Sequence, residues 1–595
     1  MSISSTPRSS LLSTRTTTAA APVFTRWQPK WCLLLWLLWV EAVKSDLISA
    51  REQLRRHEQQ QQQHDSTHRH SLLRQDHHGG NSPEPSSDVQ TKWIEQPLDH
   101  FRLSDGRSFS QRYFVSHRHV RPTPSASSST YAFLCVGGEG PALDKSVLVD
   151  SVHCTGDMLE LAAKLYQQSN QTSIYLYALE HRYYGKSYPT FSRTIQNTNG
   201  TITQPQESPV TNQNLVYLSS RQAQADLAHF VSEREKDHSL PTVGTKKTQW
   251  VTFGGSYPGM MAAWARLRFP HLITAAVSSS APIQPKLDFG AYNNHVGQVL
   301  QMTNVGGSSA CYDIVRQGHE ALSQVLSSDN RTKKEQVALA FSVCEPSTVF
   351  DNPSNAAQFL GDGVIGIGTQ GNDPACSKPL CSIAKRCAAL IHYSQDLGKS
   401  PMESLQLMAQ EQRKVHKETE CSDMSWDQTL EFLANPIQAQ AGGLRSWLWQ
   451  TCTEFGFYQT CHVNSTCPFG QGWHTLKEDY EICERAFGVA PAQVRRAIQE
   501  TLGYYGGRNL AATRILSVNG DVDPWSELAL RHSHGRSLPT LVVAGASHHF
   551  WTHASKSSDE APVVAARQVI HQTVMNWLRE AEEEVEHDGE SIATS

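Results

Sequence analysis

The chain has 595 residues, of which 18% are charged, and its formal net charge at pH 7 is -5. A chain of this length exceeds what one hydrophobic core usually organises, so we expect one large domain with a sizeable insertion, or two domains. The charge offers no basic field for nucleic acid and no polybasic stripe for anionic lipid, which excludes nucleic acid from the expected partners.

The first 90 residues predict targeting and processing segments rather than a folded domain. Residues 31–40 (WCLLLWLLWV) form an apolar run of the length of a signal-peptide core, and a membrane-spanning helix needs roughly 20 such residues. We interpret residues 1–45 as a signal peptide, with an uncleaved signal anchor as the alternative. Stable membrane association is expected only if this segment is retained. Residues 46–90 are polar and rich in glutamine and histidine, which predicts a disordered leader.

Elements are predicted along the chain from about residue 91. Alternating apolar residues first indicate antiparallel strands, and later strands are apolar runs that alternate with helical spacing, which indicates a parallel α/β sheet. The expected strands lie at 93–101, 109–116, 131–138, 173–185, 250–255 and 273–282, with helices at 157–168 and 220–232.

The character of the sequence changes over residues 286–505. This stretch is mostly helix-like and contains ten of the twelve cysteines that follow the signal, so we expect an inserted, disulfide-stapled helical cap. The sheet domain therefore has two parts, 91–285 and 506–582. Strands are expected at 514–520 and 539–547, a closing helix at 561–582 and a flexible tail at 583–595.

Cysteines and glycosylation motifs indicate the secretory pathway. Twelve cysteines outside the signal are an even number, which predicts disulfide bonds in an oxidising compartment. A zinc site of Cys376, Cys381 and Cys387 is the alternative, although their spacing lacks paired C-x-x-C units. We expect no metal and no cofactor. Four Asn-X-Thr motifs predict glycosylated surface, at Asn170, Asn199, Asn330 and Asn464.

The segment WVTFGGSYPG places Ser256 between an apolar strand and a helix-like stretch. Strand, tight turn, serine and helix form the nucleophile elbow of α/β hydrolases, which lifts a reactive hydroxyl above the sheet. The motif departs from G-x-S-x-G because Pro258 comes two residues after the serine and Gly259 three. Proline is tolerated in a first helical turn. A helix-capping serine in a plain glycine turn is the alternative.

A serine nucleophile needs a histidine base and a carboxylate, which in this fold follow it in the order Ser, Asp, His. NGDVDPW follows one late strand and offers Asp521 or Asp523. ASHHFWTH follows the next and offers His548, His549 or His553. The residues alone do not decide between these candidates.

The oxyanion hole of this fold uses the backbone N-H after the nucleophile and one from the loop after an early strand. Here the first is that of Tyr257. The glycine-rich VGGEGP offers Gly138 as the second, with a plain glycine turn as the alternative.

These motifs resemble a family of serine peptidases that contains lysosomal Pro-X carboxypeptidase, dipeptidyl peptidase II and thymus-specific serine protease. The resemblance covers residues 93 to about 578, and among these proteins the motifs are most similar to those of thymus-specific serine protease. It rests on PLDHF, QRYF, GGEGP, EHRYYGKS, YLSSRQAQADL, FGGSYPG, SSAPIQPKLDF, QTCTEFGFYQTC, NGDVDPW and GASHHF.

The resemblance implies roles for individual residues: Ser256 is the nucleophile, Asp523 the acid and His548 the base. It also implies a helical cap over a cleft that favours proline on the acyl side of the scissile bond, an acidic pH optimum, and residence in lysosomes or endosomes. The predicted signal peptide also allows an extracellular location. We expect peptide substrates and leave a homodimer open. The resemblance leaves open whether peptides are trimmed from the amino or the carboxyl end. The rival functions are an esterase or lipase on the same fold and an inactive, secreted hydrolase-like binding protein.

Overall fold

The computed structural model describes residues 88–593 except for gaps at 103, 123–127, 192–193, 198–199, 204–206, 237–246, 534 and 536. An eight-stranded sheet in the order β1-β2-β4-β3-β7-β8-β11-β12 organises the molecule. β2 runs antiparallel to β1 and β4, whereas the remaining neighbours are parallel. The prediction of an α/β-hydrolase fold is confirmed. The strands are β1 (Val89–Pro97), β2 (Ser108–His119), β3 (Ser129–Val136), β4 (Thr172–Leu179), β7 (Gln249–Gly255), β8 (Ile273–Ser279), β11 (Ile515–Gly520) and β12 (Thr540–Val543).

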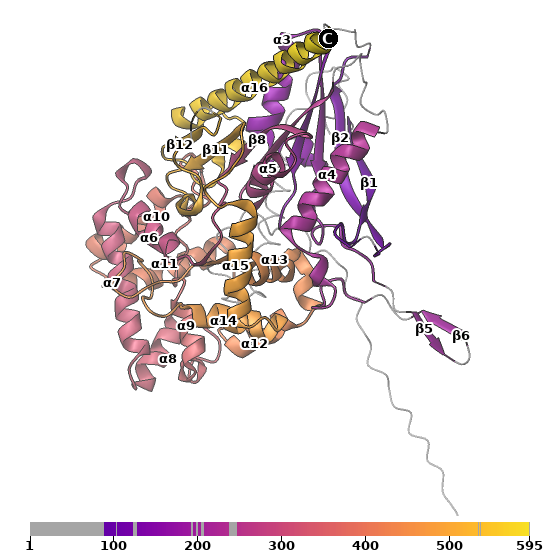
Figure 1. Cartoon of the computed structure of the whole chain (residues 1–595). Helices are drawn as coiled ribbons and strands as arrows, with labels where there is room; N and C mark the ends of the chain where they lie inside the picture. The colour runs from indigo at the N-terminus through magenta and orange to yellow at the C-terminus, as the bar shows by residue number, and fades with distance from the viewer. Residues whose placement is uncertain are drawn as a thin grey trace, which may run out of the picture.

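Helices cover both faces of the sheet, which explains why its central strands read as continuous apolar runs. α4 (Ser220–Lys236) and α5 (Tyr257–Arg268) lie on one face, and α3 (Glu160–Gln168) and α16 (Ala561–Ala593) lie on the other (Figure 1). Successive residues of β3 point to opposite faces. Leu134 therefore packs in the core that contains α5, and Phe133 packs in the core that contains α3 and α16.

The insertion follows β8 and returns to the sheet at β11, and its helices gather at one end of the sheet (Figure 1). A short parallel pair, β9 (Lys286–Asp288) and β10 (Gly456–Tyr458), joins its first residues to its later part. The prediction of an inserted helical cap is thus confirmed. Its helices are α6 (Gly290–Val299), α7 (Ser309–Leu326), α8 (Arg331–Ala340), α9 (Pro353–Leu360), α10 (Ile383–Ile391), α11 (Pro401–His416), α12 (Trp426–Ala434), α13 (Leu444–Gln450), α14 (Leu476–Phe487) and α15 (Pro491–Tyr505).

Six disulfide bonds pair the twelve cysteines that follow the predicted signal, and five of the bonds lie inside the insertion. Two of them close loops of 76 and 77 residues, the kind of crosslink that restricts the unfolded chain most. The alternative of a zinc site is wrong because all three of its cysteines form disulfide bonds. The bonds are Cys135–Cys154, Cys311–Cys387, Cys344–Cys421, Cys376–Cys381, Cys452–Cys483 and Cys461–Cys467.

The ends of the folded part differ slightly from the expected boundaries. β1 begins at Val89, within the last residues of the predicted leader. α16 continues to Ala593 instead of ending near residue 582, and the expected tail contributes four glutamates, which are good helix formers. A hairpin of β5 (Thr194–Asn197) and β6 (Gly200–Thr203) was not predicted. The signal segment and nearly all of the leader lie outside the described residues, within which no helix is long and apolar enough to span a membrane.

Candidate active site

Ser256 occupies the tight turn between β7 and α5. Its backbone φ is 64°, in the left-handed region that is strained for a residue with a side chain. The turn is crowded, because a Cβ at Gly254 would lie 2.3 Å from the carbonyl oxygen of Pro258 and one at Gly255 would lie 2.8 Å from the ring of His549. Only glycine fits these two positions, so the local sequence produces the elbow geometry in spite of the shifted glycine.

The loops after β11 and β12 bring one aspartate and one histidine together. His548 Nδ1 lies 2.7 Å from Asp523 Oδ2, and both side chains are buried. The other carboxylate oxygen of Asp523 accepts a hydrogen bond from the backbone N-H of Trp525 at 3.0 Å. The carboxylate is therefore fixed from two sides and orients the imidazole, which is the relation that a base and its carboxylate partner require.

The competing candidates have other partners. Asp521 accepts the N-H of Gly545 at 2.6 Å. His549 Nδ1 lies 3.2 Å from the hydroxyl of Thr552, and the ring of His553 packs against that of His549 with 6.3 Å between centroids. Of the alternatives that the sequence left open, the structure pairs only Asp523 with His548.

A serine triplet at the end of β8 connects the elbow to the histidine loop. The carbonyl of Ser279 accepts the N-H of Ser256 at 2.9 Å, and the hydroxyl of Ser280 accepts the N-H of His549 at 2.9 Å. Because β7, β8, β11 and β12 are adjacent in the sheet, the three loops open at the same edge. His548 Nε2 is buried and has no hydrogen-bond partner among the described residues, so it makes no hydrogen bond to Ser256 here. Such bonds are often long without substrate.

The loop after β3 lies directly against the elbow. A Cβ at Gly138 would lie 2.3 Å from Cγ of Pro258, so the backbone of this loop approaches the first turn of α5 as closely as glycine allows. The N-H of the preceding Gly137 is bonded to Leu179 at 2.8 Å. Gly138 and Tyr257 are thus neighbours, and we retain their two N-H groups as the proposed oxyanion donors.

Replacing Gly138 with alanine should lower kcat of peptide hydrolysis by about 100-fold, the range seen for losing one oxyanion donor. The added Cβ would overlap Pro258 and push the loop away from Ser256. Gly106→Ala is the matched control, because a Cβ there meets nothing within 4 Å. Equal kcat values for both variants would contradict the assignment of Gly138.

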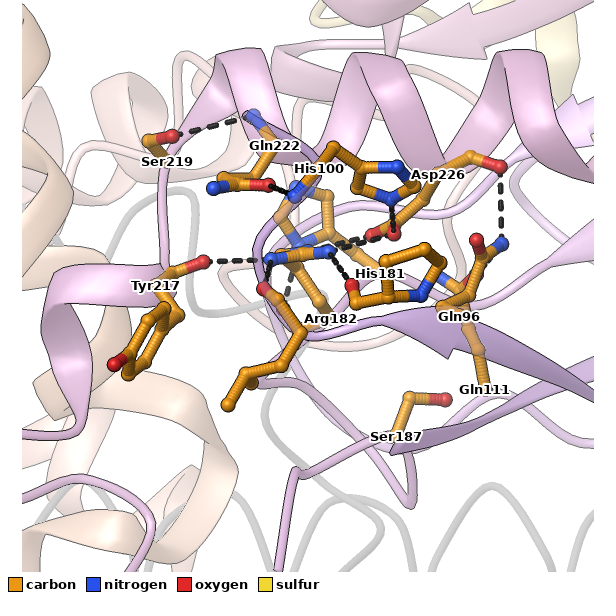
Figure 2. Close-up of polar contacts among 12 residues, drawn as sticks. Gln96, His100, Gln111, His181, Arg182, Ser187, Tyr217, Ser219, Gln222 and Asp226 are labelled. Atoms are coloured by element: carbon orange, nitrogen blue, oxygen red, sulfur yellow. Dashed lines mark hydrogen bonds and ion pairs between the residues drawn. The ribbon is translucent and has the colours of Figure 1, made fainter. Parts of the chain in front are cut away.

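A buried ion pair fixes the loop after β4, and this loop contacts Tyr257, the residue that follows Ser256. Arg182 donates to both carboxylate oxygens of Asp226 at 2.6 Å, and His100 Nε2 lies 2.7 Å from the same carboxylate (Figure 2). The fixed loop holds His181 Nε2 3.0 Å from the hydroxyl of Tyr257. Arg182 also donates to three carbonyl groups, those of Pro97, Leu98 and Tyr217.

Burial shifts the pKa values of several carboxyl groups and histidines of the protein. It raises the pKa of Glu139 to about 8 and those of Asp157 and Glu454 to about 7. Burial also lowers histidine pKa values, to about 4 for His153, His181 and His319 and to about 3 for His553.

The free energy of unfolding should have a maximum near pH 6.5. The carboxyls keep their protons to higher pH when folded than when unfolded, so they lower stability as the pH rises from about 4.5 to 8. The histidines bind protons near pH 6.5 only when unfolded, so they raise stability as the pH rises from about 4 to 6.5. They outnumber the carboxyls below pH 6.5, which produces the maximum.

Urea unfolding at pH 5, 6.5 and 8 measures this dependence. Asp157→Asn is the matched variant, because neither carboxylate oxygen of this buried side chain has a hydrogen-bond partner among the described residues. Removing its charge should raise the midpoint more at pH 8 than at pH 5. A midpoint that rises steadily from pH 5 to pH 8 in the parent would contradict the balance of charges given above.

Three of the four predicted glycosylation sites lie within the described residues, and all three asparagines are exposed: Asn170, Asn330 and Asn464. Asn199 lies outside the described residues. The amide oxygen of Asn330 also caps α8 by accepting the N-H of Lys333. Glycosylation of these positions stays a prediction.

The sequence did not predict that the insertion contacts the histidine loop. The carbonyl of Gln370 accepts the N-H of His548 at 3.2 Å, and the carbonyl of Asn372 accepts the hydroxyl of Ser547 at 2.9 Å. These acceptors are backbone atoms in a loop between α9 and α10, so no side-chain motif marks them. Ser280, by contrast, lies in the SSS run near the end of the predicted strand 273–282, where a position beside the elbow could have been inferred.

The sequence model of the family described as serine carboxypeptidase S28 matches residues 96–570, a range that contains Ser256, Asp523 and His548. The chain belongs to the S28 family. Thymus-specific serine protease of Mus musculus is 34% identical over 503 residues, covering 83% of this chain and 89% of that protein. Lysosomal Pro-X carboxypeptidase of Bos taurus is 23% identical, covering 82% and 87%.

Among solved structures, a peroxisomal α/β-hydrolase of Saccharomyces cerevisiae is similar with a TM-score of 0.30 and 9% identity, covering 85% of this chain and 97% of that chain. Membership of the S28 family makes this chain a serine-type peptidase that acts on peptides. Its six disulfide bonds are typical of proteins that fold in the secretory pathway.

Proposed function

We propose that this S28 peptidase is an exopeptidase that cleaves after proline through an acyl-enzyme formed on Ser256. The observation that carries the mechanism is the buried contact of 2.7 Å between His548 Nδ1 and Asp523 Oδ2, next to a strained serine elbow. That contact leaves Nε2 as the only ring nitrogen that can exchange a proton with the serine.

The reaction proceeds in two stages. Ser256 Oγ attacks the scissile carbonyl carbon while His548 Nε2 takes the hydroxyl proton, and the N-H groups of Gly138 and Tyr257 stabilise the oxyanion. The imidazolium gives its proton to the leaving amine as the C-N bond breaks. A water molecule then attacks the acyl-enzyme with His548 as base, releasing the acid product and restoring the serine.

The proline preference is supported by a relative named for Pro-X cleavage and by the aromatic side chains beside Asp523. Trp525 packs edge-on against Phe457 and Tyr292, with 5.5 and 5.4 Å between ring centroids. These three side chains are buried, and we propose that the cluster borders the position of the substrate proline, because aromatic rings suit a compact apolar ring. A lysosomal, endosomal or extracellular location is part of the proposal and is consistent with the disulfide bonds.

Digestion of a peptide library at pH 5 and pH 7, read by mass spectrometry of the new termini, tests this function. We expect trimming from one end only, with proline enriched on the acyl side of the cleaved bond. Labelling with a fluorophosphonate reports the nucleophile independently. A protein that hydrolyses p-nitrophenyl esters but no peptide would be an esterase, and one that neither hydrolyses nor labels would be an inactive binding protein.

A further inference from the structure

Glu139 is a buried acidic residue beside the elbow for which the reaction above has no use. It follows Gly138 in the loop after β3, whose backbone lies against Pro258. On the other side, the carbonyl oxygen of Gly140 lies 3.3 Å from where a Cβ of Gly443, in the insertion, would be. Glu139 thus sits where the elbow, the proposed oxyanion loop and the insertion meet.

The carboxyl group of Glu139 is not satisfied by the protein. The residue is 6% exposed, and its Oε2 has no hydrogen-bond partner among the described residues. Burial holds the pKa at about 8, opposed only by the residue's own backbone N-H. A buried polar atom without a partner costs free energy, and such groups are tolerated where a ligand completes them.

The polar groups near Glu139 are neutral and bonded to one another. The carboxyl group of Glu139 adds to the rise in the pKa values of the buried Tyr184 and Tyr257, whose hydroxyls contact the amide of Gln450 at 2.7 and 3.0 Å. His181 contacts Tyr257 but is uncharged, because burial lowers its pKa to about 4. None of these neighbouring side chains carries a positive charge. A cation that entered this region could therefore pair with the carboxyl group of Glu139.

We propose that Glu139 binds the α-amino group of the peptide substrate, so that the enzyme trims peptides from the amino end. An ammonium group would favour release of the Glu139 proton and pair with the carboxylate that results, whereas the carboxylate of a peptide's other end would oppose this ionisation. One residue spans about 3.5 Å. Glu139 adjoins the proposed oxyanion donor Gly138, so it is placed for an amino group one or two residues before the scissile bond. The proposal rests on the function proposed above.

Three fluorogenic or dipeptide substrates test it: Ala-Pro-aminomethylcoumarin, the same compound with an acetylated amino group, and benzyloxycarbonyl-Pro-Phe with a free carboxyl end. For the parent enzyme, kcat/KM should be at least 100-fold higher with the free amine than with the acetylated compound. In Glu139→Gln this ratio should fall by about 10- to 100-fold, mostly through KM, as expected for losing a charged hydrogen bond. Glu320→Gln, an exposed glutamate of α7, should keep the parent ratio.

The parent enzyme alone can overturn the proposal, whether or not Glu139→Gln folds. Equal rates with free and acetylated amines, or release of phenylalanine from the amino-blocked dipeptide, would show that no amino group is bound, while the serine peptidase mechanism would stand. A folded Glu139→Gln variant with the parent ratio would also overturn it. Hydrolysis of p-nitrophenyl esters without cleavage of any of the three peptides would instead refute the function on which the proposal rests.

Discussion

Ser256→Ala should lower kcat/KM for a peptide substrate by a factor on the order of 10⁵ or more, which is the scale of losing the nucleophile of a serine peptidase. The same variant should not label with a fluorophosphonate. Ser256 is buried and its backbone is strained, and replacing its hydroxyl with hydrogen removes the proposed site of acylation without opening a large cavity.

Ser327→Ala is a matched control for that experiment. Ser327 is an exposed serine at the end of α7 in the insertion. The Ser327→Ala variant should react with the fluorophosphonate and hydrolyse peptides like the parent enzyme. Labelling of Ser256→Ala at the rate of the parent would mean that another serine carries the chemistry, and the elbow assignment would then be wrong.

Asp523→Asn should lower kcat by about 10⁴-fold, because an amide at this position leaves the imidazole in the wrong tautomer and does not stabilise the imidazolium. Asp521→Asn should lower kcat by less than 10-fold. The side chain of Asp521 accepts the N-H of Gly545, and an asparagine oxygen can make the same hydrogen bond.

Steady-state kinetics on the two variants, two residues apart in one loop, therefore separate a catalytic effect from a general disturbance of the loop. Thermal unfolding of both proteins shows whether each is folded. A larger loss of kcat in Asp521→Asn than in Asp523→Asn would reverse the assignment of the acid.

The sheet and its helical insertion could be predicted from local patterns because both have strong periodic signals. β3 and β4 are buried on both faces and read as unbroken apolar runs. The insertion begins where helical spacing and clustered cysteines replace those runs. The pairing of the cysteines could not be predicted, since Cys311 finds Cys387 across 76 residues and only the packing of α7 against α10 brings them together.

The candidate site was predicted only as far as chain order reaches. The order Ser, Asp, His identifies the two loops, and only the resemblance to a family selected Asp523 and His548 within them. Which aspartate faces the imidazole depends on how the chain turns after β11, and Asp523 is set by the N-H of Trp525. The roles of these residues stay predictions until the variants are measured.

The contact between the Gln370 carbonyl and the His548 amide limits how a peptide can enter. In the proposed mechanism a substrate passes the insertion, and residues 370–372 of the insertion are bonded to the loop that carries the proposed base, His548. An outward movement of the whole insertion would break the hydrogen bond between the N-H of His548 and the carbonyl of Gln370. The imidazole of His548 would then be less well oriented for the reaction. Entry of a peptide costs less free energy if residues 370–372 stay in place and the helices near Gly443 move instead.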